Sequence, residues 1–293
     1  MRPVHVLMLV LVAALWGFNF VVIKLGLDNF PPLLFSALRF LFAAMPLVFF
    51  IPRPDVPWRI IIGIGVMLGV VKFSFLFIGM DIGVPPGLAS LLLQSQAFFT
   101  VLLAFVVLGS RPRPLQLAGM AVAFSGIALI ASSIDGSFTI TGLALVLLAA
   151  LAWASSNMLM KKAGNVPMLN LMVWVSLVPP IPLILISLLF EGVDRDLAAL
   201  SHVNLTGAGA VLFVAYGATI FGFAVWGAMI CRYGVSMVAP FSLLVPVFGM
   251  TSAALVLGEA FGPLRILAAV LIVIGLVMNV FNPQWLGRKP AAA

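Results

Sequence analysis

The chain has 293 residues, of which 64% are hydrophobic and only 8% are charged, and its mean hydropathy is +1.28. Soluble proteins carry about 25% charged residues, so this chain lacks the charge that would solvate a folded surface. The composition excludes a soluble enzyme with a single anchor and predicts about ten membrane crossings, since each crossing helix takes about 20 apolar residues.

Ten apolar stretches, bounded by proline, glycine and charged residues, predict ten membrane-spanning helices. They cover residues 4–24, 32–51, 60–80, 86–108, 114–132, 140–160, 168–190, 205–230, 235–257 and 263–281. The first stretch has no small-x-small cleavage site, so we expect a retained helix and not a signal peptide. All ten runs are too long and continuous for the strands of a membrane β-barrel, so the predicted fold class is all-α. The longest break between them falls at 191–204.

The basic residues divide unequally between the two ends of these helices. Of the fifteen Lys and Arg residues, ten lie on the side of the termini: Arg2, Arg53, Arg59, Arg111, Arg113, Lys161, Lys162, Arg232, Arg288 and Lys289. The opposite side has Lys24, Arg195 and Arg265, and two more lie within spans. The positive-inside rule therefore predicts that both termini are cytoplasmic. The net charge of +7 is explained as an orientation signal and requires no nucleic-acid partner.

The two halves of the chain resemble each other. Residues 11–26 align with 148–163 at an offset of 137, which places Trp16 on Trp153, and a second match, which places Gly126 on Gly275, has an offset of 149. These matches predict two five-helix repeats, at 1–135 and 136–293. Because five is odd, the second repeat enters the membrane from the other side, and such inverted repeats are typical of secondary transporters.

Several segments resemble the EamA family of the drug/metabolite transporter superfamily, and the likeness covers essentially the whole chain. They are LWGFNFVVIKLG near the start, SALRF, GLASLLLQSQAFFTVLLA and APFSLLVPVFGMTSAALVLGE. The last two resemble bacterial inner-membrane exporters of amino acids, including aromatic and other neutral ones, and of related metabolites. The first half departs from the pattern, since it has Gly109-Ser110 where the second half has Gly258-Glu259. The resemblance implies a multi-pass transporter of the inner (plasma) membrane.

Two cations lie inside predicted spans, where a charge is costly and its presence points to a functional site. Lys72 falls near the middle of the span 60–80. Its ammonium could bind the carboxylate of a zwitterionic substrate, or it could bind helix-end carbonyls or extend toward the interface. Arg39 is seven residues inside the span 32–51, about 10 Å from its end, and for this residue we favour structural pairing.

The uncharged polar and aromatic residues within the spans complete the candidate substrate site. Gln94 and Gln96 point about 200° apart on an α-helix, so we expect at most one of them to face a given cavity. Phe99 is a candidate wall for an apolar side chain. The other candidates, for each of which a helix-to-helix hydrogen bond is the alternative, are Trp16, Asn19, Trp153, Asn157, Tyr216 and Ser242. Pro246 interrupts the ninth span and is predicted to be a hinge or an ordinary kink, and the prolines at 179, 180 and 182 predict a bend in the seventh.

The sequence has no midplane acid, phosphate-binding loop or metal-binding cluster, and this limits the mechanisms that the protein can use. All eight acids fall in loops or span ends, so no carboxylate is placed as a midplane proton relay, and no G-x-x-x-x-G-K-[ST] phosphate loop occurs. One cysteine and two histidines exclude a metal cluster built on them. The sequence thus predicts no enzyme and no cofactor. It predicts a carrier, with the bilayer and a small molecule as partners and a monomer as the expected form, which exports amino acids or related zwitterionic metabolites by alternating access, driven by their own gradient. The alternative is a multidrug or other small-metabolite exporter, with or without proton coupling, although Lys72 would repel a cation.

Overall fold

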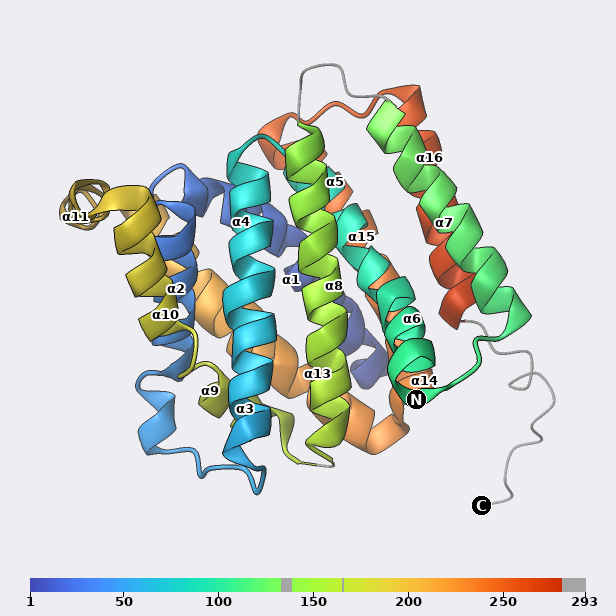
Figure 1. The fold of residues 1–293 in the computed structure, drawn as a ribbon, viewed down its shortest axis with the longest axis horizontal. Coiled ribbons are helices and arrows are strands. Elements are labelled where there is room, and N and C mark those ends of the chain that lie inside the picture. The colour runs from blue at the N-terminus through green and yellow to red at the C-terminus, as the bar shows by residue number, and fades with distance from the viewer. Residues whose placement is uncertain (133–138, 165, 281–293) are drawn as a thin grey trace.

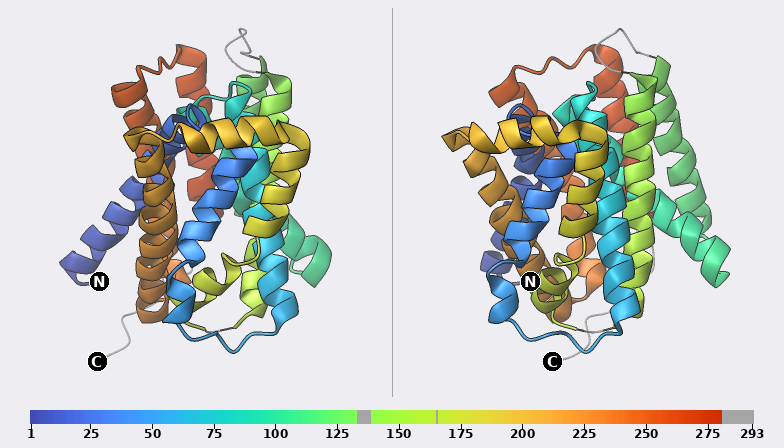
Figure 2. Two further views of the ribbon diagram at one scale, coloured as in Figure 1. Left: turned by 90° about the vertical axis from the view of Figure 1, so that its left-hand side faces the viewer. Right: turned by 60° about the vertical axis from the view of Figure 1, so that its left-hand side comes forward.

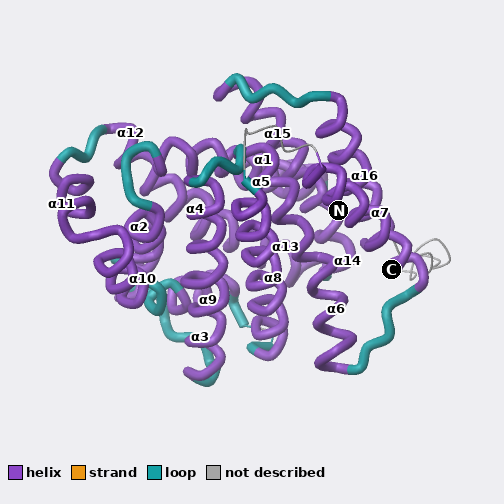
Figure 3. Tube along the Cα trace, turned by 45° about the horizontal axis from the view of Figure 1, so that its top comes forward, coloured by secondary structure: helices purple, strands orange, loops and turns teal. Residues whose placement is uncertain are grey.

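The computed structural model describes residues 1–132, 139–164 and 166–280, and within these ranges the chain is helical, with no strand (Figures 1 and 3). In the described part of the chain, ten helical segments are long and apolar enough to cross a membrane, which confirms the predicted class and number. They are Pro3–Leu27, Pro32–Phe49, Trp58–Asp81, Pro86–Val107, Pro114–Ser132, Ile140–Lys162, Met168–Ser201, Leu205–Tyr233, Ala239–Leu257 and Pro263–Val280.

Four spans are single, uninterrupted helices. Three of the four begin with proline, which has no backbone N–H and therefore suits the first helical turn, where that N–H would be unpaired. The four are α1 (Pro3–Leu27), α7 (Pro114–Ser132), α8 (Ile140–Lys162) and α16 (Pro263–Val280).

The other six spans change helix type along their length. In the first half they are α2 (Pro32–Ala44) with a 3₁₀ turn at Leu47–Phe49, α3 (Trp58–Ile64) joined to α4 (Phe73–Asp81) by a π-helical segment at Gly65–Lys72, and α5 (Pro86–Leu92) joined to α6 (Gln96–Leu108) by a 3₁₀ turn at Leu93–Ser95. In the second half they are α9 (Met168–Val175) with α10 (Pro180–Ser187), α12 (Leu205–Leu212) joined to α13 (Gly222–Tyr233) by a π-helical segment at Phe213–Phe221, and a 3₁₀ segment at Ala239–Leu243 that continues as α15 (Leu244–Leu257) after the short α14 (Val235–Val238). The predicted bend of the seventh span is confirmed, because α9 ends at Val175 and α10 begins at Pro180.

The longest predicted break, at 191–204, is largely helical. The chain continues from α10 through a π-helical segment at Leu188–Gly192 into α11 (Val193–Ser201), which lies across the direction of the spans (Figure 2). Val193, Leu197 and Leu200 follow the i, i+4, i+7 spacing and are all exposed. An apolar stripe on an otherwise polar helix is typical of a helix that lies in the membrane interface. The polar residues on the rest of this helix interrupt the apolar run, and for that reason the sequence predicts a break here.

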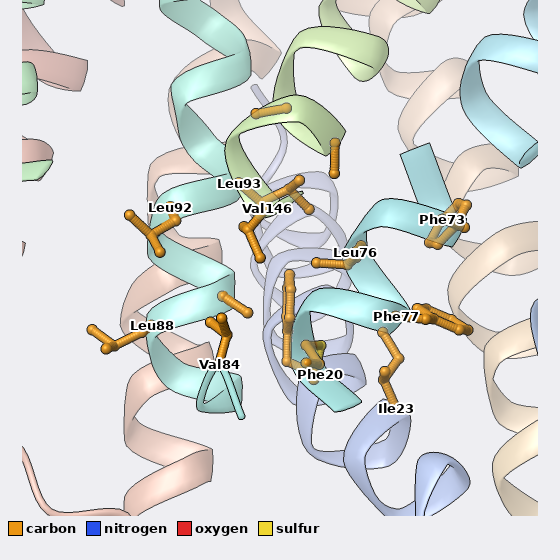
Figure 4. Close-up of a cluster of buried hydrophobic side chains, with 14 of the residues drawn as sticks. Phe20, Ile23, Phe73, Leu76, Phe77, Val84, Leu88, Leu92, Leu93 and Val146 are labelled. Atoms are coloured by element: carbon orange, nitrogen blue, oxygen red, sulfur yellow. The ribbon is translucent and has the colours of Figure 1, made fainter. Parts of the chain in front are cut away.

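The spans leave two opposite faces with different charge. The basic face carries Lys161 and Lys162 at the end of α8 and Arg53 in the loop before α3, and it lies at the bottom of Figure 1. The acidic face carries Glu191 and Glu259 and lies at the top. Between them, a core of buried hydrophobic side chains joins α1, α4, α5 and α8, as the labelled residues of Figure 4 show, among them Phe20, Leu76, Phe77, Leu88, Leu92 and Val146.

Glycines allow two pairs of helices to approach very closely. A Cβ added to Gly17 of α1 would lie 2.7 Å from the backbone nitrogen of Gly249 in α15. Between α7 and α16, a Cβ on Gly126 would lie 2.8 Å from the carbonyl oxygen of Ala268, and one on Gly275 would overlap the carbonyl oxygen of Gly119. The offset of 149 that places Gly126 on Gly275 also places Gly119 on Ala268, so these two contacts exchange under the predicted repeat.

Candidate functional site

A cavity of about 560 Å³ lies at the centre of the bundle. Its inner end is lined by Ser90 of α5 and Leu76 of α4. Its other end is lined by Lys161, Met168 and Ile230, which lie at the ends of α8, α9 and α13 on the basic face. Among the described residues, none from the connections at the acidic face lines the cavity, and those at its outer end lie at the basic face, so the cavity opens toward the basic face.

The structure brings most of the predicted site residues together around this cavity. Eight of the ten line it: Trp16, Asn19, Lys72, Gln94, Gln96, Trp153, Asn157 and Ser242. The other two lie elsewhere. Phe99 packs on Phe124 of α7 with 6.1 Å between ring centroids, and the hydroxyl of Tyr216 donates a hydrogen bond of 2.9 Å to the carbonyl oxygen of Met45. Pro246, the predicted hinge, occupies the first turn of α15 and lines a separate apolar groove between α15 and α16.

Lys72 ends the π-helical segment of the third span, and its side chain is 5% exposed. The Nζ atom lies 3.9 Å from the ring centroid of Phe73 and 4.2 Å from that of Trp153. Among the described residues, no carbonyl or carboxylate accepts a hydrogen bond from it. The ammonium is therefore held by aromatic faces, and its three donors stay available to a ligand in the cavity.

Within the ranges that the structure describes, Arg39 of α2 does not have the acidic partner that structural pairing would normally supply. Its Nε and Nη2 atoms both donate to the hydroxyl of Thr219, at 3.1 and 3.0 Å, and Thr219 donates in turn to the carbonyl oxygen of Val214. The guanidinium is buried, lines the cavity and lies 4.0 Å from the ring centroid of Phe73. Its Nη1 atom has no partner among the described residues. Arg39 is thus a candidate ligand-binding group that the sequence pattern did not select.

The two buried cations lie against the same aromatic ring, and no acid in the described part of the chain compensates their charge. Lys72 and Arg39 both contact Phe73, and none of the described residues that line the cavity is an aspartate or a glutamate. Like charges repel strongly where water is scarce, because the effective dielectric constant is low. Each cation is associated with a π-helical segment: Lys72 belongs to one, and Thr219, the partner of Arg39, belongs to the one at Phe213–Phe221. Such helical irregularities are common at functional sites. The site therefore favours an anionic group placed between the two cations.

Gln94 and Gln96 both line the cavity, so the expectation that only one would do so is wrong. The fourth span is not a regular α-helix here, because a 3₁₀ turn covers Leu93–Ser95. The two long amides also reach opposite walls: Gln94 Nε2 donates to the carbonyl oxygen of Ser242 at 2.8 Å, and Gln96 Oε1 accepts from Asn157 Nδ2 at 2.8 Å. In α1, the buried Asn19 Oδ1 has no partner among the described residues and is a further acceptor for a ligand.

Aromatic rings form one wall of the cavity. Trp16 lies 5.1 Å from Trp226 and 5.3 Å from Phe223, measured between ring centroids, and its indole N–H donates to the carbonyl oxygen of Ala218 at 2.9 Å. Trp226 and Phe223 were not among the predicted site residues, because most of the 24 phenylalanines of such a chain face lipid or the core. Phe223 and Trp226 are three residues apart, so they lie on the same face of α13, and this spacing is the sequence feature that could have identified them as an aromatic wall.

The chain is similar to known membrane transporters over nearly its whole length. The model of the EamA-like transporter family matches residues 4–132 and 140–281. Two relatives are named probable amino-acid metabolite efflux pump: one from Salmonella typhimurium is 44% identical over 278 residues (93% of each chain), and one from Escherichia coli is 42% identical over 281 residues (94% of each). The uncharacterized inner membrane transporter YedA of Escherichia coli is 24% identical over 293 residues, 95% of this chain and 91% of its own. A crystal structure with 21% identity and a TM-score of 0.63, covering 95% of this chain and 96% of that one, shares the fold.

Proposed function

Because the chain belongs to the EamA-like transporter family, we propose that it exports amino acids or related zwitterionic metabolites, with aromatic and other neutral amino acids favoured. The chain is a multi-pass transporter of the inner membrane and not an enzyme. The single observation that carries the choice of substrate is the pair of buried cations, Lys72 and Arg39, which face the cavity with no acid among its described lining residues. A carboxylate is the group of an amino acid that this pair would bind.

The rest of the cavity is compatible with a zwitterion that has an apolar side chain. The side-chain oxygen of Asn19 and the faces of Trp16 and Trp153 can receive an α-ammonium, since a cation is attracted to an aromatic face. The wall of Trp16, Phe223 and Trp226 offers flat apolar surface to an aromatic or aliphatic side chain. A cationic drug would meet two positive charges and no acid, which disfavours the multidrug alternative.

We propose alternating access between two inverted five-helix repeats, with the basic face in the cytoplasm. The family model matches the chain twice, on either side of residue 135, and the contacts between α7 and α16 exchange under the repeat. The cavity opens toward the basic face, which the positive-inside rule assigns to the cytoplasm. The structure would then represent the inward-facing state, in which the carrier loads its cargo, and the second repeat would supply the opposite movement.

We further propose that the substrate gradient alone drives export. No carboxylate lines the cavity within the described residues, so the site has no acid that could couple a proton to the substrate. In proteoliposomes without a pH, sodium or voltage gradient, labelled phenylalanine is therefore expected to enter with saturable kinetics until it equilibrates. Uptake that is undetectable under these conditions and restored by an imposed gradient would contradict a facilitator, and linear, non-saturating uptake would indicate a channel.

A further inference from the structure

Two glutamates of the second half cap two helices of the first half on the acidic face. We propose that Glu191 and Glu259 act as a two-point latch that keeps this face closed while the cavity is open to the basic face, and that both caps must release for the cavity to open outward. The inference rests on the alternating access proposed above and assigns positioning roles to two residues that the cavity does not include.

Glu259 follows the end of α15 by two residues and caps α5. Its Oε2 atom accepts a hydrogen bond of 3.0 Å from the backbone N–H of Gly87, and the side chain is half-buried. A Cβ at position 87 would lie 2.5 Å from the ring of Phe261, so a larger residue here would require that ring in the α15–α16 connection to move. Burial raises the pKa of the Glu259 carboxyl, and the hydrogen bonds from Gly87 and Leu88 and the charge of Arg265 lower it in part. The carboxylate therefore occupies a partly buried site in which backbone N–H groups of α5 bind it.

Glu191 caps α2 with both of its oxygens. Oε1 accepts from the backbone N–H of Leu33 at 2.8 Å, and Oε2 accepts from that of Leu34 at 3.1 Å. The hydroxyl of Ser187, one turn earlier, lies 2.5 Å from Oε2 and 2.8 Å from Oδ2 of the buried Asp196, so its single proton is shared between these two carboxylates. Since the amides of a first helical turn have no partner within the helix and carry a partial positive charge, a carboxylate is the side chain best suited to them.

Both caps join the two halves of the chain, and both lie opposite to the open end of the cavity. The partners are separated by 158 and 172 residues. Proline begins α2 and α5, so the amides that follow Pro32 and Pro86 are the first available donors of each helix. The same arrangement at two separate helix pairs is what a closure between two moving bodies requires.

A tight helix contact separates the Glu259 cap from the cavity. Gly249 of α15 touches Ser90 of α5 and Gly17 of α1, so closely that no side chain would fit at either glycine. Ser90 and Val245 line the inner end of the cavity. An outward opening must therefore separate α15 from α1 and α5, and because Glu259 extends from the end of α15, this movement pulls its carboxylate away from Gly87.

The latch is tested by chemical labelling, in a background in which Cys231 is replaced by serine. Ser90→Cys reports outward opening in the Glu191→Ala variant, and Ser36→Cys, on α2, reports it in the Glu259→Ala variant, so that each reporter lies on the helix whose cap is intact. A membrane-impermeant maleimide applied to the acidic face is expected to label each reporter at least ten-fold faster than in the parent. The Gln variants, which keep one acceptor oxygen, should give intermediate rates, and Asp194→Ala, which removes an exposed acid of the same face, should give the parental rate.

A third reporter separates a gating change from local unfolding. Ala239→Cys lines the cavity near the basic face, so a shift toward the outward-open state should slow its labelling from that side. Faster labelling at the acidic face together with slower labelling at the basic face supports the latch. Parental labelling in both the Ala and the Gln variants overturns it. If acidic-face labelling rises while the rate at Ala239→Cys stays unchanged, the loss of the caps has only unfolded the helix ends locally, and the latch is overturned. No substrate is used, so the result is independent of the substrate assignment.

Discussion

A Lys72→Met variant is expected to lose about ten- to hundred-fold in kcat/KM for amino-acid counterflow. Loss of a hydrogen bond to a charged group costs about 1.5–3 kcal/mol, and each 1.4 kcal/mol corresponds to a factor of about ten. The fold should persist, because among the described residues no acid pairs with this ammonium and would be left uncompensated. Counterflow kinetics of the purified variant, together with its elution as a single species, measure both effects.

The control for Lys72 is a lysine of the same cavity that lies at its open end. Lys161 is exposed at the basic face, where water screens its charge, so Lys161→Met should change kcat/KM much less. A Lys72→Arg variant keeps the charge and should retain part of the activity. Parental kinetics in Lys72→Met would remove this residue from the binding site.

An Arg39→Met variant is the second change from which we expect a large loss, again about ten-fold or more in kcat/KM. The guanidinium presents its unpartnered Nη1 from a fixed position, since Thr219 holds Nε and Nη2. Lysine lacks this planar fork, so Arg39→Lys should recover little activity. Thr219→Val, which frees the guanidinium to turn, should raise KM more than it lowers kcat.

The thermal stability of Arg39→Met in detergent is expected to equal or exceed that of the parent. Removing a buried charge without an acidic partner relieves a desolvation cost, and Thr219 still donates to the carbonyl oxygen of Val214. A variant that keeps the parental transport kinetics would show that Arg39 supports the fold and does not bind substrate. A variant that unfolds at a markedly lower temperature would show the same, because the transport loss would then follow from damage to the fold.

The spans could be predicted from sequence because each is separated from the next by turn-forming or charged residues that interrupt the apolar run, such as Pro85-Pro86 and Asp135-Gly136. The depth of Lys72 could be predicted for a related reason, since a lone cation within an apolar run is rare and costly. Both signals are local, and both depend on a large transfer free energy.

The features that escaped prediction depend on irregular backbone or on contacts between distant residues. The relation between Gln94 and Gln96 was derived for a regular α-helix, and the 3₁₀ turn between them changes it. Phe99 has a side chain suited to a cavity wall, but it packs on α7. Periodicity alone does not indicate which face of a buried helix meets the cavity. Glu191 and Glu259 fall in breaks between the predicted spans, and the sequence does not show their partners because these are more than 150 residues away.

Counterflow of labelled phenylalanine against phenylalanine amide tests the central claim most directly. The amide keeps the side chain and the ammonium and lacks only the carboxylate that Lys72 and Arg39 are proposed to bind. With purified protein in liposomes, internal phenylalanine should accelerate entry of the label, and internal phenylalanine amide should not. Equal acceleration by the two compounds would contradict carboxylate recognition by the cation pair and, with it, the proposed site.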